Sequence, residues 1–281
     1  MLTVLEIIKR STDFFASKGI ESPRLNAELL IGHALALKRM QLYLQFERPL
    51  TDVELDKIRP LIRRRGQHEP VQYITGETDF HGLRLKVDRR ALIPRPETEQ
   101  LVEHALAFCA APPNRILDLG TGTGALALAL AQARPEANVV AVDLSADALA
   151  LARENAAAHG LDGRVQFIQS DWFAAVPAGA TFDLIVANPP YLSDEEVAAA
   201  PVEVRDFEPV MALAARESGL ADLRAIVAAA SPFLAGGGVL ALETGPMQHA
   251  ALEAAARNAG FRRVESRRDL AGRDRFVLAS K

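Results

Sequence analysis

The sequence predicts an α/β protein, in which a small helical bundle precedes a Rossmann-like, doubly wound sheet. Up to residue 70, apolar residues recur only at the spacing of helices. From Arg115 onward, short apolar stretches alternate with helical ones, as in proteins whose parallel strands are joined by helices. A glycine-rich loop follows the first of those stretches, at the position where such sheets bind ligands.

Residues 1–70 are expected to form the helical bundle. Ile8 and Phe15 lie on one face of a first predicted helix. Thr51 is followed three residues later by Glu54, and this capping box predicts the start of another helix. We expect the whole segment to fold as one small domain.

A change in pattern at Pro70 predicts a β-hairpin over residues 71–90. Residues 71–74 and 83–87 have the composition of short strands, and glycines lie between them. We expect this hairpin to link the helical bundle to the second domain, residues 91–281.

The second domain is expected to contain a mostly parallel sheet. Its predicted strands are 116–119, 139–142, 165–168, 182–187, 239–242, 262–266 and 276–278. Its predicted helices are 97–108, 125–134, 146–158, 219–233 and 247–259. The first strands are apolar throughout, as expected of a parallel sheet that is buried on both faces. No helix separates the last two strands, so we expect the last strand to run antiparallel.

The composition excludes several classes of protein. The chain has 281 residues and a net charge of −4, which argues against a surface devoted to binding nucleic acid. Its one cysteine, Cys109, cannot form an internal disulfide, and we interpret it as a buried, inert thiol. We find no signal peptide at the N-terminus and no apolar run long enough to span a bilayer. A cytoplasmic protein without a membrane segment is therefore expected.

The loop Gly120-Thr121-Gly122-Thr123-Gly124 is a candidate cofactor site. Glycine permits a tight turn and a close approach of the backbone to a ligand. Asp143 ends the next predicted strand and could accept the hydroxyl hydrogens of a ribose. The loop lacks the G-x-G-x-x-G spacing of dinucleotide sites, so an adenosine ligand without phosphates, such as S-adenosylmethionine, fits better. On its own, the loop could also be a structural turn.

Asp171 and Trp172 follow the third predicted strand and are candidates for the adenine site. Asp171 could face the amino group of adenine, and Trp172 could lie against the ring. The alternative interpretation is a helix-capping aspartate beside a core tryptophan.

The sequence Asn188-Pro189-Pro190-Tyr191 follows the fourth predicted strand and is a candidate acceptor site. The side-chain oxygen of Asn188 and the carbonyl of Pro189 could each accept one hydrogen from a planar NH2 group. Prolines stiffen the loop and bring no N–H group that would compete. Tyr191 could lie against the plane of the acceptor. The nitrogen lone pair would then face a sulfonium methyl group, although a proline-rich turn capped by asparagine is the alternative.

Several ordered motifs resemble the release-factor glutamine methyltransferases, the PrmC/HemK family. They are the segments 69–76, 92–99 and 207–209, together with Asn-Pro-Pro-Tyr after the glycine loop, and the resemblance covers roughly residues 68–279. It implies a class I methyltransferase fold and S-adenosyl-L-methionine as cofactor. The implied substrate is the glutamine of the Gly-Gly-Gln motif in bacterial class 1 peptide release factors, methylated on its side-chain nitrogen.

The resemblance also implies roles for single residues. The cofactor-binding residues that it implies are Gly120, Thr121, Gly122, Thr123, Gly124, Asp143 and Trp172. With them we expect Asp171 and Asn188 to contact the cofactor. The implied substrate clamp is Asn188, Pro189, Pro190 and Tyr191, of which Asn188, Pro189 and Tyr191 are the catalytic candidates. Phe80 matches an aromatic residue that the family places near adenine, whereas His81 departs from the usual aromatic. Arg95 and Glu208 match family positions, where they could order a loop over the cofactor or form a surface ion pair.

The expected partner is a release factor, recognised with the help of residues 1–70 by a monomeric enzyme. Two other functions remain open at this point. One is methylation of an amino group on adenine or guanine in nucleic acid, which requires the base to leave its stack. The other is a non-catalytic adaptor that keeps the fold but binds no cofactor.

Overall fold

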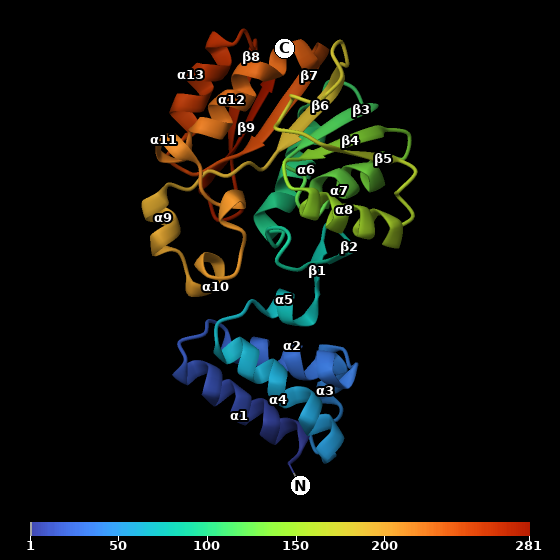
Figure 1. Ribbon diagram of the computed structural model, residues 1–281, viewed down its shortest axis with the longest axis vertical. Helices are drawn as coiled ribbons and strands as arrows, with labels where there is room; N and C mark the ends of the chain where they lie inside the picture. Colours follow the sequence, from blue (N-terminus) through green and yellow to red (C-terminus); the bar gives the residue numbers. More distant parts are fainter. Residues whose placement is uncertain (1) are drawn as a thin grey trace. The chain divides into compact units, whose positions relative to one another are not determined.

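The computed structural model describes residues 2–281, which form two compact units (Figure 1). The first unit contains the chain up to Glu77 and the segment Pro201–Phe207. The second contains Thr78–Ala200 and Glu208–Lys281. No helix within residues 2–281 has the length and apolarity needed to cross a bilayer.

The first unit is helical, as the spacing of its apolar residues predicts. Its helices are α1 (Val4–Ser17), α2 (Pro23–Leu35), α3 (Arg39–Tyr43), α4 (Asp52–Gly66), α5 (Val71–Thr75) and α10 (Val202–Arg205). Ile8, Phe15 and Ile74 are buried together in its core. The capping box of Thr51 and Glu54 is present at the start of α4, which confirms that prediction.

The strand predicted at residues 71–74 is wrong, because this segment forms the short helix α5. Five residues are too few for apolar spacing to separate a strand from a helical turn. Here Tyr73 and Ile74 are buried, and Gly76 ends the helix in the left-handed conformation that favours glycine. The hairpin itself exists, but its first strand begins at Glu77.

That hairpin pairs β1 (Glu77–Phe80) with β2 (Leu83–Lys86). The two turn residues, His81 and Gly82, have φ angles of 46° and 79°. Positive φ at both positions matches the twist of a tight hairpin. His81 is therefore a turn residue, and the strand before it ends in Phe80, which is buried in the core.

The second unit is built on a seven-stranded sheet with the order β5-β4-β3-β6-β7-β9-β8. Its strands are β3 (Arg115–Leu119), β4 (Asn138–Asp143), β5 (Val165–Gln169), β6 (Phe182–Ala187), β7 (Leu234–Glu243), β8 (Arg263–Arg268) and β9 (Asp274–Ser280). β9 pairs antiparallel with both β7 and β8, as predicted for the last strand, and the other pairs of neighbouring strands are parallel. The predicted fold class is confirmed.

Helices cover both faces of the sheet. The long ones are α6 (Pro96–Phe108), α7 (Ala125–Ala133), α8 (Ala146–Ala158), α12 (Ala221–Ala230) and α13 (His249–Asn258). Shorter elements are α9 (Asp194–Ala199), α11 (Arg216–Gly219) and the 3-10 turns η1 (Val210–Ala212) and η2 (Ser231–Phe233). The helix predicted at 219–233 is shorter than expected, because Gly219 has a positive φ and Pro232 lies in a 3-10 turn.

The side chains of neighbouring residues in a strand lie on opposite faces of the sheet and pack into two different hydrophobic cores. Ile116 packs with α6 and α7, whereas Leu117 packs with α12 and α13. The strand β3 lies between β4 and β6, so the chain order reverses there. Ligands of such sheets bind at the carboxyl ends of the strands beside that reversal.

Candidate functional site

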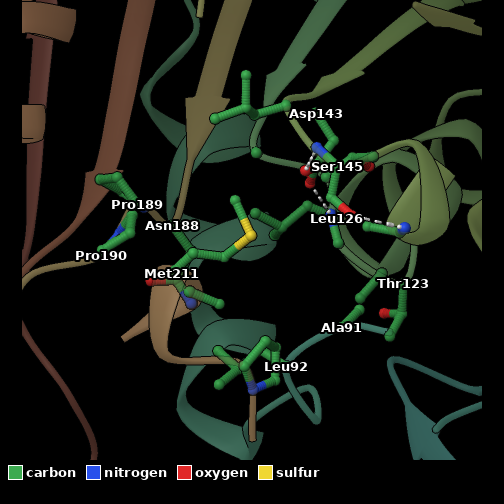
Figure 2. Close-up of a pocket in the computed structure, with 18 of the residues that line it drawn as sticks. Ala91, Leu92, Thr123, Leu126, Asp143, Ser145, Asn188, Pro189, Pro190 and Met211 are labelled. Atoms are coloured by element: carbon green, nitrogen blue, oxygen red, sulfur yellow. Dashed lines mark hydrogen bonds between the residues drawn. The ribbon is translucent and has the colours of Figure 1, made fainter. Parts of the chain in front are cut away.

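A cavity of about 340 Å³ lies at the carboxyl ends of β3, β4 and β6 (Figure 2). Leu119 pairs with Val142 on one side and Ala187 on the other, so the residues that follow these strands are neighbours. Most predicted site residues line the cavity: Gly120, Thr121, Gly122, Thr123, Asp143, Asp171, Trp172, Asn188, Pro189 and Pro190. Gly124 and Tyr191 are not among its lining residues.

The glycine loop is folded back on the sheet. The N–H groups of Gly120 and Thr121 both donate to the carbonyl of Val142, at 2.9 Å. Gly124 begins α7 with φ 86°, and a Cβ atom there would lie 3.2 Å from Leu128 and 3.3 Å from Ala152. Gly124 therefore has a packing role, which explains why it lies outside the cavity.

Asp143 is held in a fixed orientation at the end of β4. One carboxylate oxygen accepts from the N–H of Gly122 at 2.8 Å, and the other accepts from the N–H of Ser145 at 2.9 Å. Each oxygen keeps a further lone pair for a ligand hydroxyl group. Burial raises the pKa of Asp143, and the backbone hydrogen bonds oppose that rise. These features suit a carboxylate that accepts two hydroxyl hydrogens of a ribose.

Trp172 combines the two interpretations that the sequence left open. Its side chain packs on the core, yet it lines the cavity and lies close to Gly120, where a Cβ atom would be 3.3 Å from the indole. Its φ of 45° is unusual for a bulky residue. The hydroxyl of Ser170 donates to the Trp172 carbonyl at 2.8 Å and accepts from the N–H of Ala175 at 2.9 Å, which supports this backbone. Asp171 is exposed and begins a turn, so it has no helix to cap.

Asn188 follows β6, and Figure 2 shows it beside the same cavity as Asp143. Its side-chain Nδ2 lies 3.3 Å from the hydroxyl oxygen of Thr98 in α6. That hydroxyl in turn donates to the carboxylate of Glu243, at 2.7 Å. One end of the Asn188 amide is thus engaged by the protein.

The hydroxyl of Tyr191 is engaged by two other residues of the protein. It donates to Glu243 at 3.3 Å and accepts from Arg275 at 3.1 Å. Burial raises the pKa of Tyr191, and the negative charge of Glu243 raises it further. The hydroxyl group therefore stays protonated at neutral pH and acts as a hydrogen-bond donor.

Arg95, which lines the cavity, forms a partly buried ion pair with Glu208. Arg95 donates to Glu208 at 2.6 Å, and the N–H of Ile93 donates to the other carboxylate oxygen at 3.3 Å. The Glu208 side chain is only 2% exposed, so this is not the surface ion pair that the sequence left open. The pair joins two segments that line the cavity, one with Pro94 and the other with Met211.

Replacing Arg95 with alanine is expected to lower the free energy of unfolding by about 1–3 kcal/mol, because a buried carboxylate would lose its charged partner. Urea unfolding measures the change. Arg224→Ala is the control, since Arg224 and Glu217 form an ion pair in which both side chains are exposed, and its loss should cost less than about 1 kcal/mol. Equal effects of the two substitutions would contradict a structural role for the buried pair.

Asp118 lies behind the glycine loop, and the sequence suggested no role for it. It is fully buried in β3, where one oxygen accepts from the hydroxyl of Thr121 at 2.6 Å and from the N–H of Ala127 at 3.2 Å. Its other oxygen has no hydrogen-bond partner within residues 2–281. Burial raises the pKa of Asp118 to about 7. The sequence could have singled out Asp118, because it is an acidic residue inside an otherwise apolar strand.

The raised pKa of Asp118 predicts a pH-dependent stability. Between about pH 4 and pH 7 the folded chain keeps a proton that the unfolded chain releases, so the free energy of unfolding falls as pH rises through this window. Asp118→Asn removes the titrating group. The decrease in the free energy of unfolding between about pH 4 and pH 7 should therefore be smaller in this variant by more than about 1 kcal/mol. Urea unfolding at a series of pH values measures it, with the exposed Asp162→Asn as control. Parallel curves for Asp118→Asn and the unsubstituted chain would contradict the prediction.

The remaining residues named from the sequence lie elsewhere. Phe80 is buried in the core and does not line the cavity. Cys109 is half-buried and not fully buried as expected, and its burial raises the pKa of the thiol to about 11, in line with an inert side chain. Within residues 2–281, no group of histidine, cysteine, aspartate or glutamate is arranged to hold a metal ion.

Comparison with known proteins assigns the chain to a family. Family models match the PrmC N-terminal domain over residues 6–76 and the methyltransferase small domain over residues 98–204. The release factor glutamine methyltransferase of Chlorobaculum tepidum is 46% identical over 250 residues, with 86% of this chain and 85% of that protein covered. The protein of the same name from Salmonella typhimurium is 46% identical over 257 residues, with 92% of each chain covered. This chain belongs to the release factor glutamine methyltransferase family.

Solved structures agree on the fold of this family member. The catalytic domain of hMettl16 in complex with MAT2A 3′UTR hairpin 1 has a TM-score of 0.62 and 17% identity, over 79% of this chain and 80% of that chain. At such low identity the likeness concerns the fold alone. It supports a class I methyltransferase sheet, which is the architecture predicted from the sequence.

Proposed function

We propose that this protein methylates the side-chain amide nitrogen of the glutamine in the Gly-Gly-Gln motif of bacterial class 1 peptide release factors, with S-adenosyl-L-methionine as methyl donor. Membership of the family supports the reaction and the substrate class. The observation that carries the proposal is the shared cavity, which Asp143 lines from β4 and Asn188 from the end of β6. A donor and an acceptor held there would be neighbours.

The cofactor half of the proposal rests on the glycine loop, Asp143 and Trp172. Asp143 accepts the two ribose hydroxyl hydrogens with the lone pairs that Gly122 and Ser145 leave free. Trp172 would form the wall for the adenine ring, and the exposed Asp171 would face the adenine amino group. When bound, S-adenosylmethionine supplies an electrophilic methyl group, and an aromatic or carbonyl-rich wall suits its positive charge.

The acceptor half rests on Asn188 and Pro189. The Asn188 side-chain oxygen and the Pro189 carbonyl each accept one hydrogen of the glutamine amide, which orients its nitrogen toward the methyl group. An amide nitrogen is a poor nucleophile because its lone pair is delocalised. Hydrogen bonds to both hydrogens favour the pyramidal nitrogen of the transition state, and fixed positioning lowers the barrier further. Pro190 stiffens the segment after β6, and Tyr191 anchors that segment through its hydrogen bond to Glu243.

A methylation assay tests the proposed function. The protein and labelled cofactor are incubated with purified release factor or with ribosomal RNA and DNA, and mass spectrometry locates the modified residue. Label on the glutamine of the Gly-Gly-Gln motif is the expected result. Label only in nucleic acid would instead support methylation of a base amino group. Because release factors act in translation, we also expect the enzyme in the cytoplasm, and we expect it to act as a monomer.

We further propose that the helical unit recognises the intact release factor. On α3 and at its end, Met40 and Leu44 are 71% and 85% exposed, four residues apart. Large exposed apolar side chains at helical spacing suit a protein partner. Met40→Ser/Leu44→Ser is therefore expected to raise KM for release factor by about tenfold, whereas KM for a short Gly-Gly-Gln peptide should not change. An equal rise for both substrates, or for neither, would contradict this role.

A further inference from the structure

We propose that Thr98 and Glu243 are positioning residues that fix which end of the Asn188 amide faces the acceptor. This inference deepens the proposed function and rests on it for its catalytic consequence. The three residues come from different parts of the fold, since Thr98 lies in α6, Glu243 ends β7 and Asn188 follows β6. They form one chain of hydrogen bonds at the edge of the cavity.

These hydrogen bonds are buried, although Thr98 also lines the cavity. Glu243 and Thr98 are 1% and 4% exposed. One oxygen of the Glu243 carboxylate accepts from the Thr98 hydroxyl at 2.7 Å, and the other accepts from the Tyr191 hydroxyl at 3.3 Å. Arg275 donates to that tyrosine at 3.1 Å, so a positive charge lies behind the carboxylate. Glu243 is thereby supplied with donors on both oxygens.

The number of hydrogens available in these hydrogen bonds determines which end of the Asn188 amide faces Thr98. A threonine hydroxyl has one hydrogen, and here it is donated to Glu243. Toward Asn188 the Thr98 oxygen can therefore only accept, so its partner at 3.3 Å must be the NH2 end of the amide. The Asn188 oxygen is left for the cavity, which Asn188 lines together with Pro189.

The orientation of the Asn188 amide decides whether it attracts or repels the NH2 group of the substrate glutamine. The two ends of an asparagine amide have nearly the same shape, so packing alone distinguishes them poorly. With the amide turned over, its NH2 group would meet the NH2 group of the glutamine, and two donors would face each other. Thr98 and Glu243 thus act on the reaction through Asn188, whose amide they orient.

Kinetics of Thr98 variants test the inference. Thr98→Val keeps the shape but removes the hydroxyl group, and we expect kcat to fall about tenfold to a hundredfold because the acceptor is misplaced. The dissociation constant of S-adenosylmethionine should not change. Thr98→Ser keeps the hydroxyl group and should retain most of kcat. In an Asn188→Ala background, Thr98→Val should lower kcat no further, as expected of residues that act through one another.

A second variant tests whether the effect of Thr98→Val comes from the hydrogen bonds or from a loss of folding. Glu243→Gln keeps the size of the side chain but places an NH2 group that can donate toward Thr98, which frees the Thr98 hydrogen to bond to the Asn188 oxygen. Its kcat should fall as in Thr98→Val, with thermal unfolding used to confirm that both variants are folded. Normal kcat in both variants, or equal losses with and without Asn188, would overturn the inference.

An NMR measurement separates this inference from the proposed function. The side-chain NH2 signals of Asn188, identified by their loss in Asn188→Ala, report the hydrogen bond to Thr98 without any substrate. We expect these signals to shift in Thr98→Val and to stay in place in Thr98→Ser. Unchanged signals in Thr98→Val would overturn the inference even if release factor is methylated. A shift without methylation of release factor by the unsubstituted protein would instead reject the proposed function alone.

Discussion

Asn188→Ala is expected to lower kcat by roughly two to three orders of magnitude, because it removes a hydrogen-bond acceptor that acts in the transition state. Cofactor binding should be nearly unchanged, since the proposed ribose and adenine sites involve residues at the end of β4 and after β5. Single-turnover methylation of release factor at saturating cofactor measures the loss, and calorimetric titration measures cofactor affinity.

Turnover and cofactor affinity must be compared to assign the role of Asn188. A general loss of structure would lower cofactor affinity and turnover together, and thermal unfolding would reveal it. Weakened cofactor binding with normal turnover at saturation would show that Asn188 serves the cofactor and not the acceptor.

Asp143→Ala is expected to show the reverse pattern, with a cofactor dissociation constant raised by about two to four orders of magnitude. Two hydrogen bonds to a charged oxygen are lost, at about 1.5–3 kcal/mol each. The loop is also loosened, because Asp143 holds the N–H groups of Gly122 and Ser145. At saturating cofactor, kcat should recover most of its normal value.

The exposed Asp147, in the first turn of α8, provides a matched control for Asp143. Asp147→Ala removes the same charge from the same part of the chain and should leave the cofactor dissociation constant unchanged. Equal affinity in Asp143→Ala and Asp147→Ala would contradict the ribose role. Failure of the unsubstituted protein to bind cofactor at all would favour a non-catalytic adaptor.

The sheet and the cavity were predictable from local sequence because their signals are local. The four strands predicted between residue 116 and residue 187 all formed parallel strands, and the polar residues that follow them gathered at one edge. Parallel strands end at the same edge of a sheet, so the order of strands and polar residues along the chain was enough to place Asp143 and Asn188 in one site.

The supporting contacts could not be predicted in this way, because their partners are far apart in the chain. Thr98 and Glu243 are separated by 145 residues, and Ile93 and Glu208 by 115. No spacing rule links such residues, although Glu243 is a charged residue that ends an apolar strand and so resembles Asp118. The helix α5 was missed for a different reason, since it is too short for apolar periodicity to identify.

A structure of the protein with S-adenosylhomocysteine and a Gly-Gly-Gln peptide tests the central claim most directly. The quantity to measure is the position of the glutamine side-chain nitrogen. We predict that it lies about 2.9 Å from both the Asn188 side-chain oxygen and the Pro189 carbonyl oxygen, on the side of the cavity that faces the cofactor sulfur. A glutamine nitrogen that contacts neither oxygen, or an Asn188 that presents its NH2 group to the peptide, would contradict the account.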